Sequence, residues 1–219
     1  MFWAANYFPK SNRVTAIFIT FEGIDGSGKS TQSKLLAKTL ADQGVDVIIT
    51  REPGGSVGAE DIRKLLVEGE TDRWSPETEI LLFTAARRDH LEKTIRPALA
   101  NGTVVISDRF ADSTRVYQGV ARADLRKTVD ALHDTIIKVE PDLTFIIDVD
   151  PEQALTRGLA RNSGEDRFED FGLQFQMDLR AGFLALASEN ENRCRVIDGN
   201  RPIDAIASDV LSIAKAAIG

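Results

Sequence analysis

The sequence predicts an α/β domain in which helices flank a mainly parallel, five-stranded sheet. Five short apolar runs, rich in Val, Ile and Phe, alternate with longer segments whose apolar residues recur at helical spacing. The runs show little polar alternation, which is typical of parallel strands buried on both faces. A glycine-rich turn follows the first run and leads directly into a helical segment. Together these features favour repeated strand-turn-helix units over an all-α or all-β fold.

The predicted strands span residues 14–21, 45–50, 103–107, 143–149 and 195–197. The second of them, 45–50, is expected to be buried like the first, because both are continuous apolar runs. Parallel strands end at one edge of their sheet, so the residues that follow each strand are expected to gather there.

Helical segments separate these strands. Residues 29–43 form the first and end at Gly44, and residues 57–69 form the second. The next helix has Ser75 as its cap and Pro76 in its first position. Helical spacing returns over 125–139, and another helix opens at Asp150 with Pro151 behind it. The final helices carry a packing stripe made by Phe168, Phe171, Phe175, Leu179, Phe183, Ile206, Val210 and Ile213.

Composition excludes several classes of protein. The 219 residues are 42% hydrophobic and 28% charged, which is globular rather than disordered, collagen-like or coiled-coil. The net charge of −7 argues against coating nucleic acid or an anionic membrane. No apolar run is long enough to span a bilayer, and no convincing signal peptide is present. The single cysteine, Cys194, fits a reducing cytosol and is expected in the core. We expect one domain over 14–219, preceded by an extension at 1–13.

The strongest motif is a phosphate loop of the form GxxxxGK[ST]. It lies between a predicted strand and a predicted helix, where this motif must lie to work. Its glycines let backbone N–H groups surround phosphate oxygens, and the helix N-terminus adds partial positive charge. Lys29 would reach the β and γ phosphates of ATP, and Ser30 would ligate magnesium. The ATP-binding residues expected here are Gly23, Ile24, Asp25, Gly26, Ser27, Gly28, Lys29, Ser30 and Thr31.

Three classes of phosphate-loop protein are possible: kinases, nucleotide-hydrolysing switches and noncatalytic nucleotide binders. A guanine-specific switch needs an Asn/Thr-Lys-x-Asp motif after a later strand, and the sequence has none. A kinase needs a second anion site and mobile cations over the transferring phosphoryl group. Arg51 and Arg109 each follow a predicted strand, at the edge where the phosphate loop lies. The kinase interpretation is therefore favoured.

A polar segment near the fourth strand has the composition of a short lid at about 157–169. Arg157 and Arg161 are four residues apart, so on a helix they present their guanidinium groups together, and Arg167 follows. The break Asn162-Ser163-Gly164 allows flexing. These arginines are expected to cover the transferring phosphoryl group. The alternative is a solvated surface.

With these features in place, the chain resembles the thymidylate kinase family from about Ile17 to its C-terminus. The motifs that carry the resemblance are Phe21 to Ser30, Arg51 to Gly55, Phe83 with Arg87, Asp108-Arg109-Phe110, Ser113-Thr114 with Tyr117-Gln118, and the lid arginines. The resemblance implies a five-stranded parallel sheet and transfer of the γ-phosphoryl group of ATP to dTMP, giving dTDP for dTTP biosynthesis. It also implies Mg²⁺, a homodimer and a cytoplasmic location. The alternatives are a kinase for another pyrimidine monophosphate and a noncatalytic nucleotide-binding module.

The resemblance assigns roles to residues of the second anion site. It places the thymine against Phe83 and Arg87, and the acceptor phosphate against Arg51 and Arg109. It also implies that the Asp25 carboxylate accepts a hydrogen bond from the sugar 3′-hydroxyl. The remaining substrate-binding residues that it implies are Ser113, Thr114, Tyr117 and Gln118, with Tyr117 lying where a 2′-hydroxyl would project.

Simpler interpretations of these residues stay open. Phe83 and Tyr117 could be packing residues, and Arg51 and Arg109 could form surface salt bridges. For magnesium, Asp108 and Asp148 both end an apolar run, and we favour Asp108 because Arg109 is adjacent. The two histidines, His90 and His133, have no paired ligand or nucleophile in the sequence and are expected to have structural or surface roles rather than catalytic ones.

Overall fold

The structure is a computed structural model that describes residues 15–70, 73–122, 125–159 and 172–219. Its described residues form one five-stranded sheet in which all pairs are parallel, with the strand order β2-β3-β1-β4-β5. The strands are β1 (Phe18–Glu22), β2 (Val47–Arg51), β3 (Val104–Asp108), β4 (Leu143–Asp148) and β5 (Cys194–Asp198). The predicted fold class is confirmed.

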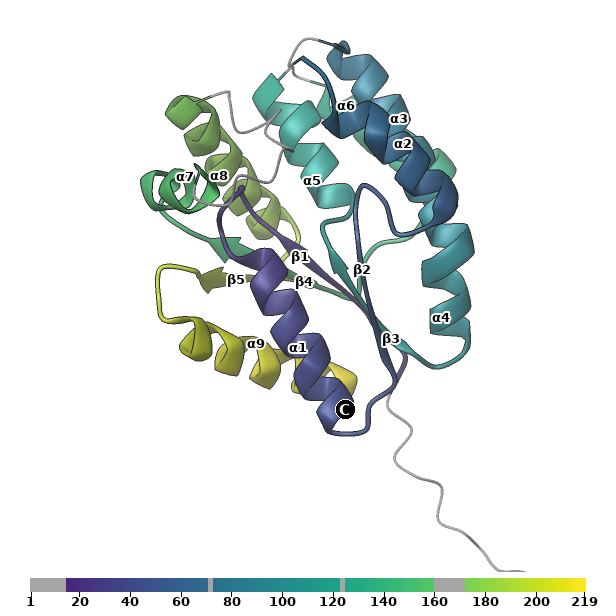
Figure 1. Ribbon diagram of the computed structural model, residues 1–219, viewed down its shortest axis with the longest axis vertical. Coiled ribbons are helices and arrows are strands. Elements are labelled where there is room, and N and C mark those ends of the chain that lie inside the picture. Colours follow the sequence, from purple (N-terminus) through teal and green to yellow (C-terminus); the bar gives the residue numbers. More distant parts are fainter. Residues whose placement is uncertain (1–14, 71–72, 123–124, 160–171) are drawn as a thin grey trace, which may run out of the picture.

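Helices cover both faces of the sheet (Figure 1). They are α1 (Lys29–Asp42), α2 (Val57–Val67), α3 (Pro76–His90), α4 (Arg96–Ala100), α5 (Ala111–Val116), α6 (Arg126–Leu132), α7 (Pro151–Leu159), α8 (Gly172–Glu189) and α9 (Ile203–Ile218). Three π-helical turns continue α3, α5 and α6; these are η1 (Leu91–Ile95), η2 (Tyr117–Arg122) and η3 (His133–Ile137).

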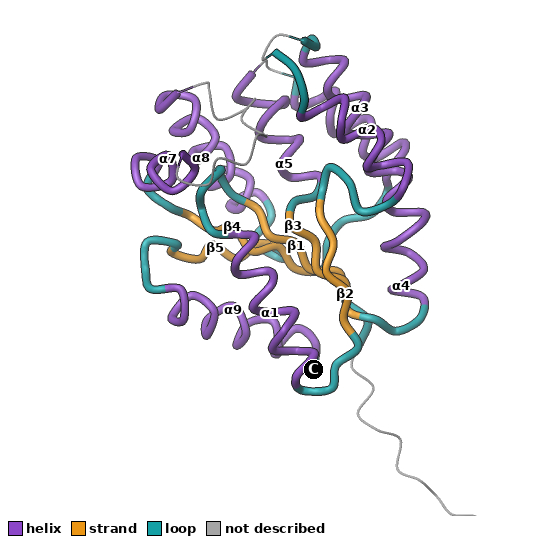
Figure 2. The backbone as a smooth tube through the Cα atoms, viewed as in Figure 1, coloured by secondary structure: helices purple, strands orange, loops and turns teal. Residues whose placement is uncertain are grey.

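The apolar core lies on both sides of the sheet. On one face, α1 and α9 pack against the strands through residues such as Leu36, Leu40 and Val210. On the other, the cores around Phe18 and Phe183 join the strands to η1, α5 and α8. Figure 2 shows the sheet between these two layers of helices. This arrangement leaves the carboxyl ends of β1, β3 and β4 together at one edge.

Helix starts and ends follow the predicted local signals. Ser75 accepts a hydrogen bond from the N–H of Thr78 at 3.2 Å, with Pro76 in the first position of α3. Gly44 follows α1 with a φ of +79°, the left-handed conformation that glycine adopts without strain. Phe175, Leu179 and Phe183 are buried as predicted. Phe168 and Phe171 lie outside the described residues, as do 1–13 and the break at 162–164.

Two expectations about the elements are wrong. The strand at 45–50 is not buried on both faces, because β2 is an edge strand and Ile49 is 45% exposed. The helix predicted over 125–139 is divided, since α6 passes into η3 at His133. The sequence reasoning also gave no helix for 111–122, where α5 and η2 lie. Among the described residues, no helix is long and apolar enough to cross a membrane.

Candidate active site

The phosphate loop joins the end of β1 to the start of α1 at the carboxyl edge of the sheet. Its backbone needs glycine: Gly26 has a φ of +76°, and a Cβ there would lie 2.1 Å from the carbonyl oxygen of Ala154 in α7. Gly28 caps α1 without a side-chain hydrogen bond. The Lys29 ammonium is buried and donates to the carbonyl oxygen of Ile24 at 3.1 Å. The loop therefore has the close-packed backbone that a phosphate-binding turn requires.

Asp25 of this loop is held by two side chains from the other side of the site. Arg109, which follows β3, forms an ion pair with one carboxylate oxygen. The Tyr117 hydroxyl donates to the other oxygen at 2.8 Å, and Lys29 lies 3.5 Å from the first. Arg109 also lies over the Tyr117 ring, 5.1 Å from its centroid. A carboxylate next to a phosphate site is thus balanced by cations.

Electrostatics keep Asp25 ionised. Burial alone would raise its pKa, but the charges of Arg109 and Lys29 and the Tyr117 hydrogen bond hold the pKa well below the usual range. Burial raises the pKa of Tyr117, so its hydroxyl keeps the proton that it donates to Asp25. The site consequently presents an acceptor, Asp25, beside a donor group, Arg109, which has five N–H donors to distribute.

A cavity opens beside these residues, between the phosphate loop, α3 and α5. Eight of the nine substrate-binding residues that the sequence suggested line it: Asp25, Phe83, Arg87, Arg109, Ser113, Thr114, Tyr117 and Gln118. Glu52, Pro53 and Phe110, which lie in the quoted motifs but were given no role, line it as well, and so do Arg63 and Val67, which the sequence did not indicate. Phe83 is half-buried and faces this cavity rather than the closed core.

Arg51 is the exception among the predicted residues. Its side chain is 53% exposed and pairs with Glu60 at 3.2 Å, and it is not among the residues that line the cavity. The reason is its position at the end of β2, the edge strand, where it faces α2. In this structure Arg51 forms the surface salt bridge that was the simpler interpretation.

Arg87 is buried and has three protein partners. Its Nε donates to Glu52 at 2.7 Å, and its Nη2 donates to the carbonyl oxygen of Phe110 and to Thr114 Oγ1 at 3.1 and 3.0 Å. Glu52 also bonds His90 Nδ1 at 3.0 Å, and His90 Nε2 lies 2.7 Å from Thr50 Oγ1. These bonds fix the guanidinium at the cavity wall.

The two candidate magnesium carboxylates have different surroundings. Asp148 is bound by Arg180 through two hydrogen bonds of 2.6 and 2.8 Å. Asp108 Oδ1 is buried and has no hydrogen-bond partner within the described part of the chain. A buried oxygen with free lone pairs, next to the phosphate loop, suits a hard cation such as Mg²⁺. The geometry therefore fits Asp108 better than Asp148.

The lid arginines are only partly placed. Arg157 lies in the last turn of α7, three residues after Ala154, whose carbonyl is in contact with Gly26 of the phosphate loop. The described structure therefore sets the backbone of α7 beside the loop. The side chain of Arg157, and Arg161 and Arg167 entirely, lie outside what the structure describes.

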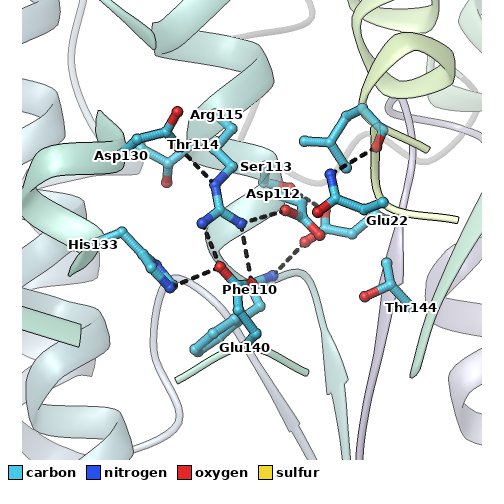
Figure 3. Close-up of polar contacts among 12 residues, drawn as sticks. Glu22, Phe110, Asp112, Ser113, Thr114, Arg115, Asp130, His133, Glu140 and Thr144 are labelled. Atoms are coloured by element: carbon cyan, nitrogen blue, oxygen red, sulfur yellow. Dashed lines mark hydrogen bonds and ion pairs between the residues drawn. The ribbon is translucent and has the colours of Figure 1, made fainter. Parts of the chain in front are cut away.

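A second charged cluster lies beneath α5 and was not predicted (Figure 3). Asp112 is 1% exposed and accepts from Arg193 at 2.6 and 2.9 Å and from Arg115 at 2.7 Å. Arg115 also pairs with Glu140 and with Asp130. His133 bonds Glu140 at 3.0 Å. We call Asp112, Arg115, Asp130, His133, Glu140 and Arg193 the buried ionic cluster.

Comparison with known proteins agrees with the geometry. The model of the family described as Thymidylate kinase matches residues 21–210, which include the phosphate loop and the cavity. The thymidylate kinase of Dinoroseobacter shibae is 71% identical over 194 residues, covering 89% of this chain and 94% of the relative. That of Ruegeria pomeroyi is 64% identical over 199 residues, covering 91% and 94%. A crystal structure of thymidylate kinase from Ehrlichia chaffeensis gives a TM-score of 0.73 at 39% identity, covering 91% of this chain and 98% of that one.

Proposed function

Because the chain belongs to the thymidylate kinase family and so phosphorylates dTMP with ATP, we propose that the cavity beside the phosphate loop is the dTMP site. The observation that carries this proposal is the meeting of Asp25, Arg109 and Tyr117 at the shared border of the loop and the cavity. An acceptor phosphate bound there would face the γ-phosphate held by Lys29. Phosphoryl transfer needs this in-line placement more than it needs covalent catalysis.

Each wall of the cavity matches one part of dTMP. Arg109 binds the acceptor phosphate, because a guanidinium fork matches two phosphate oxygens. Asp25 accepts from the 3′-hydroxyl, and Tyr117 occupies the space of a 2′-hydroxyl. Phe83 stacks on the thymine, and Arg87 donates to a base carbonyl. Arg51 could bind the acceptor phosphate only by giving up its ion pair with Glu60. Ser113, Thr114 and Gln118 complete the site.

Mg²⁺ would be held by Ser30 and Asp108, with the remaining positions taken by phosphate oxygens and water. Bound there, the ion would neutralise charge that develops on the β and γ phosphates. The unpartnered oxygen of Asp108 supports this assignment, as does the ion pair of the alternative carboxylate, Asp148, with Arg180. Lys29 supplies a second cation from within the loop.

The lid supplies the remaining cation in this proposal. Arg157 and Arg161 would close over the transferring phosphoryl group on the side that Lys29 does not reach. The phosphate loop has Asp25, Gly26 and Ser27 and so offers no arginine of its own. Arg157→Ala and Arg161→Ala are each expected to lower kcat by about 10³-fold with little change in dTMP affinity. A kcat within a few fold of the parent in the double variant would make the lid a cover only.

The active form is proposed to be a cytoplasmic homodimer. Leu65, Leu81 and Ile136 are 39%, 58% and 38% exposed and lie on α2, α3 and η3, which pack side by side. Light scattering should give twice the chain mass, and Leu81→Asp should halve it. Val196→Asp, on β5 where Val196 is 48% exposed, is the control. A monomeric parent protein would contradict the proposal.

Lys29→Ala, assayed with a panel of nucleoside monophosphates, tests the proposed site as a whole. ADP release by the parent protein should depend on dTMP and exceed release with other pyrimidine monophosphates. Lys29→Ala should lower kcat about 10²- to 10³-fold, since it removes a preorganised charge at the reacting phosphate. Equal turnover with every pyrimidine monophosphate would favour a broader kinase. Unchanged turnover in Lys29→Ala would remove the phosphate loop from the mechanism.

A further inference from the structure

Glu22 is the last residue of β1, directly before the phosphate loop, and its carboxylate is fully buried. We propose that Glu22 is a positioning residue: it sets the direction of the Ser113 hydroxyl and thereby holds Arg109 in its phosphate-binding orientation. The inference rests on the proposed role of Arg109 at the acceptor phosphate and extends it to a residue that does not line the cavity.

A series of hydrogen bonds runs from Glu22 to the site, and Figure 3 shows its first members, Glu22, Phe110 and Ser113. Glu22 Oε1 accepts from the backbone N–H of Phe110 at 2.7 Å, and Oε2 accepts from Ser113 Oγ at 2.5 Å. Ser113 Oγ in turn lies 3.0 Å from Arg109 Nη1. Arg109 then reaches Asp25 with its other terminal nitrogen.

The donor and acceptor directions in this series of hydrogen bonds depend on the charge of Glu22. A serine hydroxyl has one proton, and a guanidinium can only donate. Ser113 can therefore accept from Arg109 only if its own proton points elsewhere, and an ionised Glu22 takes that proton in a hydrogen bond. A glutamine at position 22 that accepts the Phe110 N–H would direct its amide N–H at Ser113, so the hydroxyl proton would lose the acceptor that holds it away from Arg109. Ser113 would then no longer be fixed as an acceptor for Arg109, and Arg109 would lose this support.

The burial of a carboxylate here needs such a reason, because burying a charge is costly. Burial and the neighbouring Asp112 charge raise the pKa of Glu22 to about 7, so the ionised form that orients Ser113 predominates above about pH 7. Asp112 already has Arg115 and Arg193 as partners, and neither is bonded to Glu22. A neutral glutamine could accept the Phe110 N–H equally well. The feature that a glutamine cannot supply is a second acceptor, directed at Ser113.

Arg109 is a residue that needs support. Its φ of +72° lies in the left-handed region, which is unfavourable for a residue with a side chain. Its carbonyl accepts from Ser107 Oγ at 2.8 Å, and Glu22 fixes the next N–H, that of Phe110. Glu22 therefore acts on the backbone turn at Arg109 and Phe110 and, through Ser113, on the Arg109 side chain. The substitution by glutamine separates these two actions, since it preserves the acceptor for Phe110.

The test is a double-mutant cycle on Glu22→Gln and Ser113→Ala, with kcat/KM for dTMP and KM for ATP as readouts. Each single variant should lower kcat/KM for dTMP about tenfold, the effect of losing one charge-assisted hydrogen bond. KM for ATP should stay within about twofold in each. The double variant should be no worse than Ser113→Ala, because both changes act through one hydroxyl. Ser113→Thr, which keeps a hydroxyl, should restore most of the loss.

Asp142→Asn is the matched control, because Asp142 accepts the Phe18 N–H at the opposite end of the same strand. It should leave kcat/KM for dTMP unchanged. Multiplying effects in the double variant, or an equal rise in KM for ATP, would overturn the inference. Arg109→Ala distinguishes failure of the proposed dTMP site from failure of the role of Glu22. If it spares dTMP binding, the proposed site is wrong; if it abolishes binding while Glu22→Gln has no effect, only the role of Glu22 is wrong.

Discussion

Two clusters of arginine and carboxylate side chains lie on either side of α5. They differ in whether their arginines can also bind a ligand. In the buried ionic cluster, Asp112 is 1% exposed and receives three hydrogen bonds from Arg115 and Arg193. At the cavity, Arg109 is paired with Asp25, whose side chain is 26% exposed. In the first cluster the side chains of Asp112, Arg115 and Arg193 are buried, whereas Asp130 and Glu140 at its rim are 38% and 43% exposed. The second cluster borders the cavity.

The comparison teaches that ion pairing alone does not mark a functional arginine. Arg115 and Arg193 are committed to protein carboxylates, and breaking such a buried pair leaves a charge without solvent. Arg109 lines the cavity, so a bound phosphate can take the place of the protein acceptors that its two terminal nitrogens now use. The buried cluster is therefore assigned to stability and the cavity cluster to binding.

The largest expected effect is on stability. Arg193→Ala removes two hydrogen bonds to Asp112 and should lower the free energy of unfolding by about 3–5 kcal/mol, because a buried charge loses its partner. Denaturant titration measures this. Arg126→Ala is the control, since its pairs with Asp130 and Glu189 are partly exposed and should be worth less than about 1 kcal/mol. If the folded Arg193→Ala protein bound dTMP much more weakly, the two clusters would not be separate in function.

Glu22 lies between the clusters and makes stability depend on pH. Its folded pKa of about 7 exceeds the ordinary value of 4.5, so between these values the folded state holds a proton that the unfolded state has released. Stability from this group therefore falls as pH rises from about 4.5 to about 7, by about 3 kcal/mol in total. Glu22→Gln should remove this component.

The measurement is the difference in unfolding free energy between Glu22→Gln and the parent, taken from pH 5 to pH 8. The difference should increase in favour of the variant up to about pH 7 and then level off. Other titrating groups are common to both proteins and cancel in the difference. A difference that does not vary with pH would mean that Glu22 titrates alike in both states.

Substitution of Arg87 tests whether the cavity binds the thymine base of dTMP. Arg87→Ala should weaken dTMP binding by about 1–3 kcal/mol, because a base carbonyl loses its donor, and should leave ATP affinity unchanged. Calorimetric titration with each nucleotide separates the two. Lys93→Ala, an exposed position in the η1 turn that continues α3, is the control and should change neither. Equal dTMP affinity in Arg87→Ala would restrict this arginine to its structural bonds with Glu52 and Thr114.

Tyr117 should give the smallest effect, on sugar selection. Tyr117→Ala should narrow the preference for the deoxyribose over the ribose form of the acceptor by about tenfold, since a hydroxyl is excluded only by lack of space. Tyr117→Phe keeps the ring and loses the bond to Asp25, so it should keep most of the preference. The ratio of kcat/KM for the two acceptors measures this. An unchanged ratio in Tyr117→Ala would leave packing against Phe175 and Phe183 as its role.

Much of the fold could be predicted because its signals are local. Apolar runs, the cap at Ser75 and the stop at Gly44 act within a few residues of themselves. Strand order is not local, so nothing in the run at 45–50 indicated that β2 would be an edge strand with Ile49 exposed. The helix α5 was missed because its polar residues Asp112 and Arg115 face a buried ionic cluster rather than solvent.

The candidate site divides in the same way. The phosphate loop and Arg109 could be found because motif and strand end coincide in the sequence. Glu52 could not be assigned to Arg87, because 35 residues separate them and only the folded chain joins them. Glu22 looked like the end of an apolar strand, and its bond to Ser113 spans 91 residues. Arg51 carried the same signal as Arg109, yet the position of its strand turned it toward Glu60.

Calorimetric titration of dTMP into the parent protein and into Arg109→Ala tests the central claim most directly, namely that Arg109 is the arginine that binds the acceptor phosphate. Losing a charge-assisted, two-pronged contact to phosphate should weaken dTMP binding at least about tenfold, and more if both prongs are used. ATP binding should change little. An unchanged dissociation constant for dTMP would contradict the claim and would move the acceptor site away from this cavity.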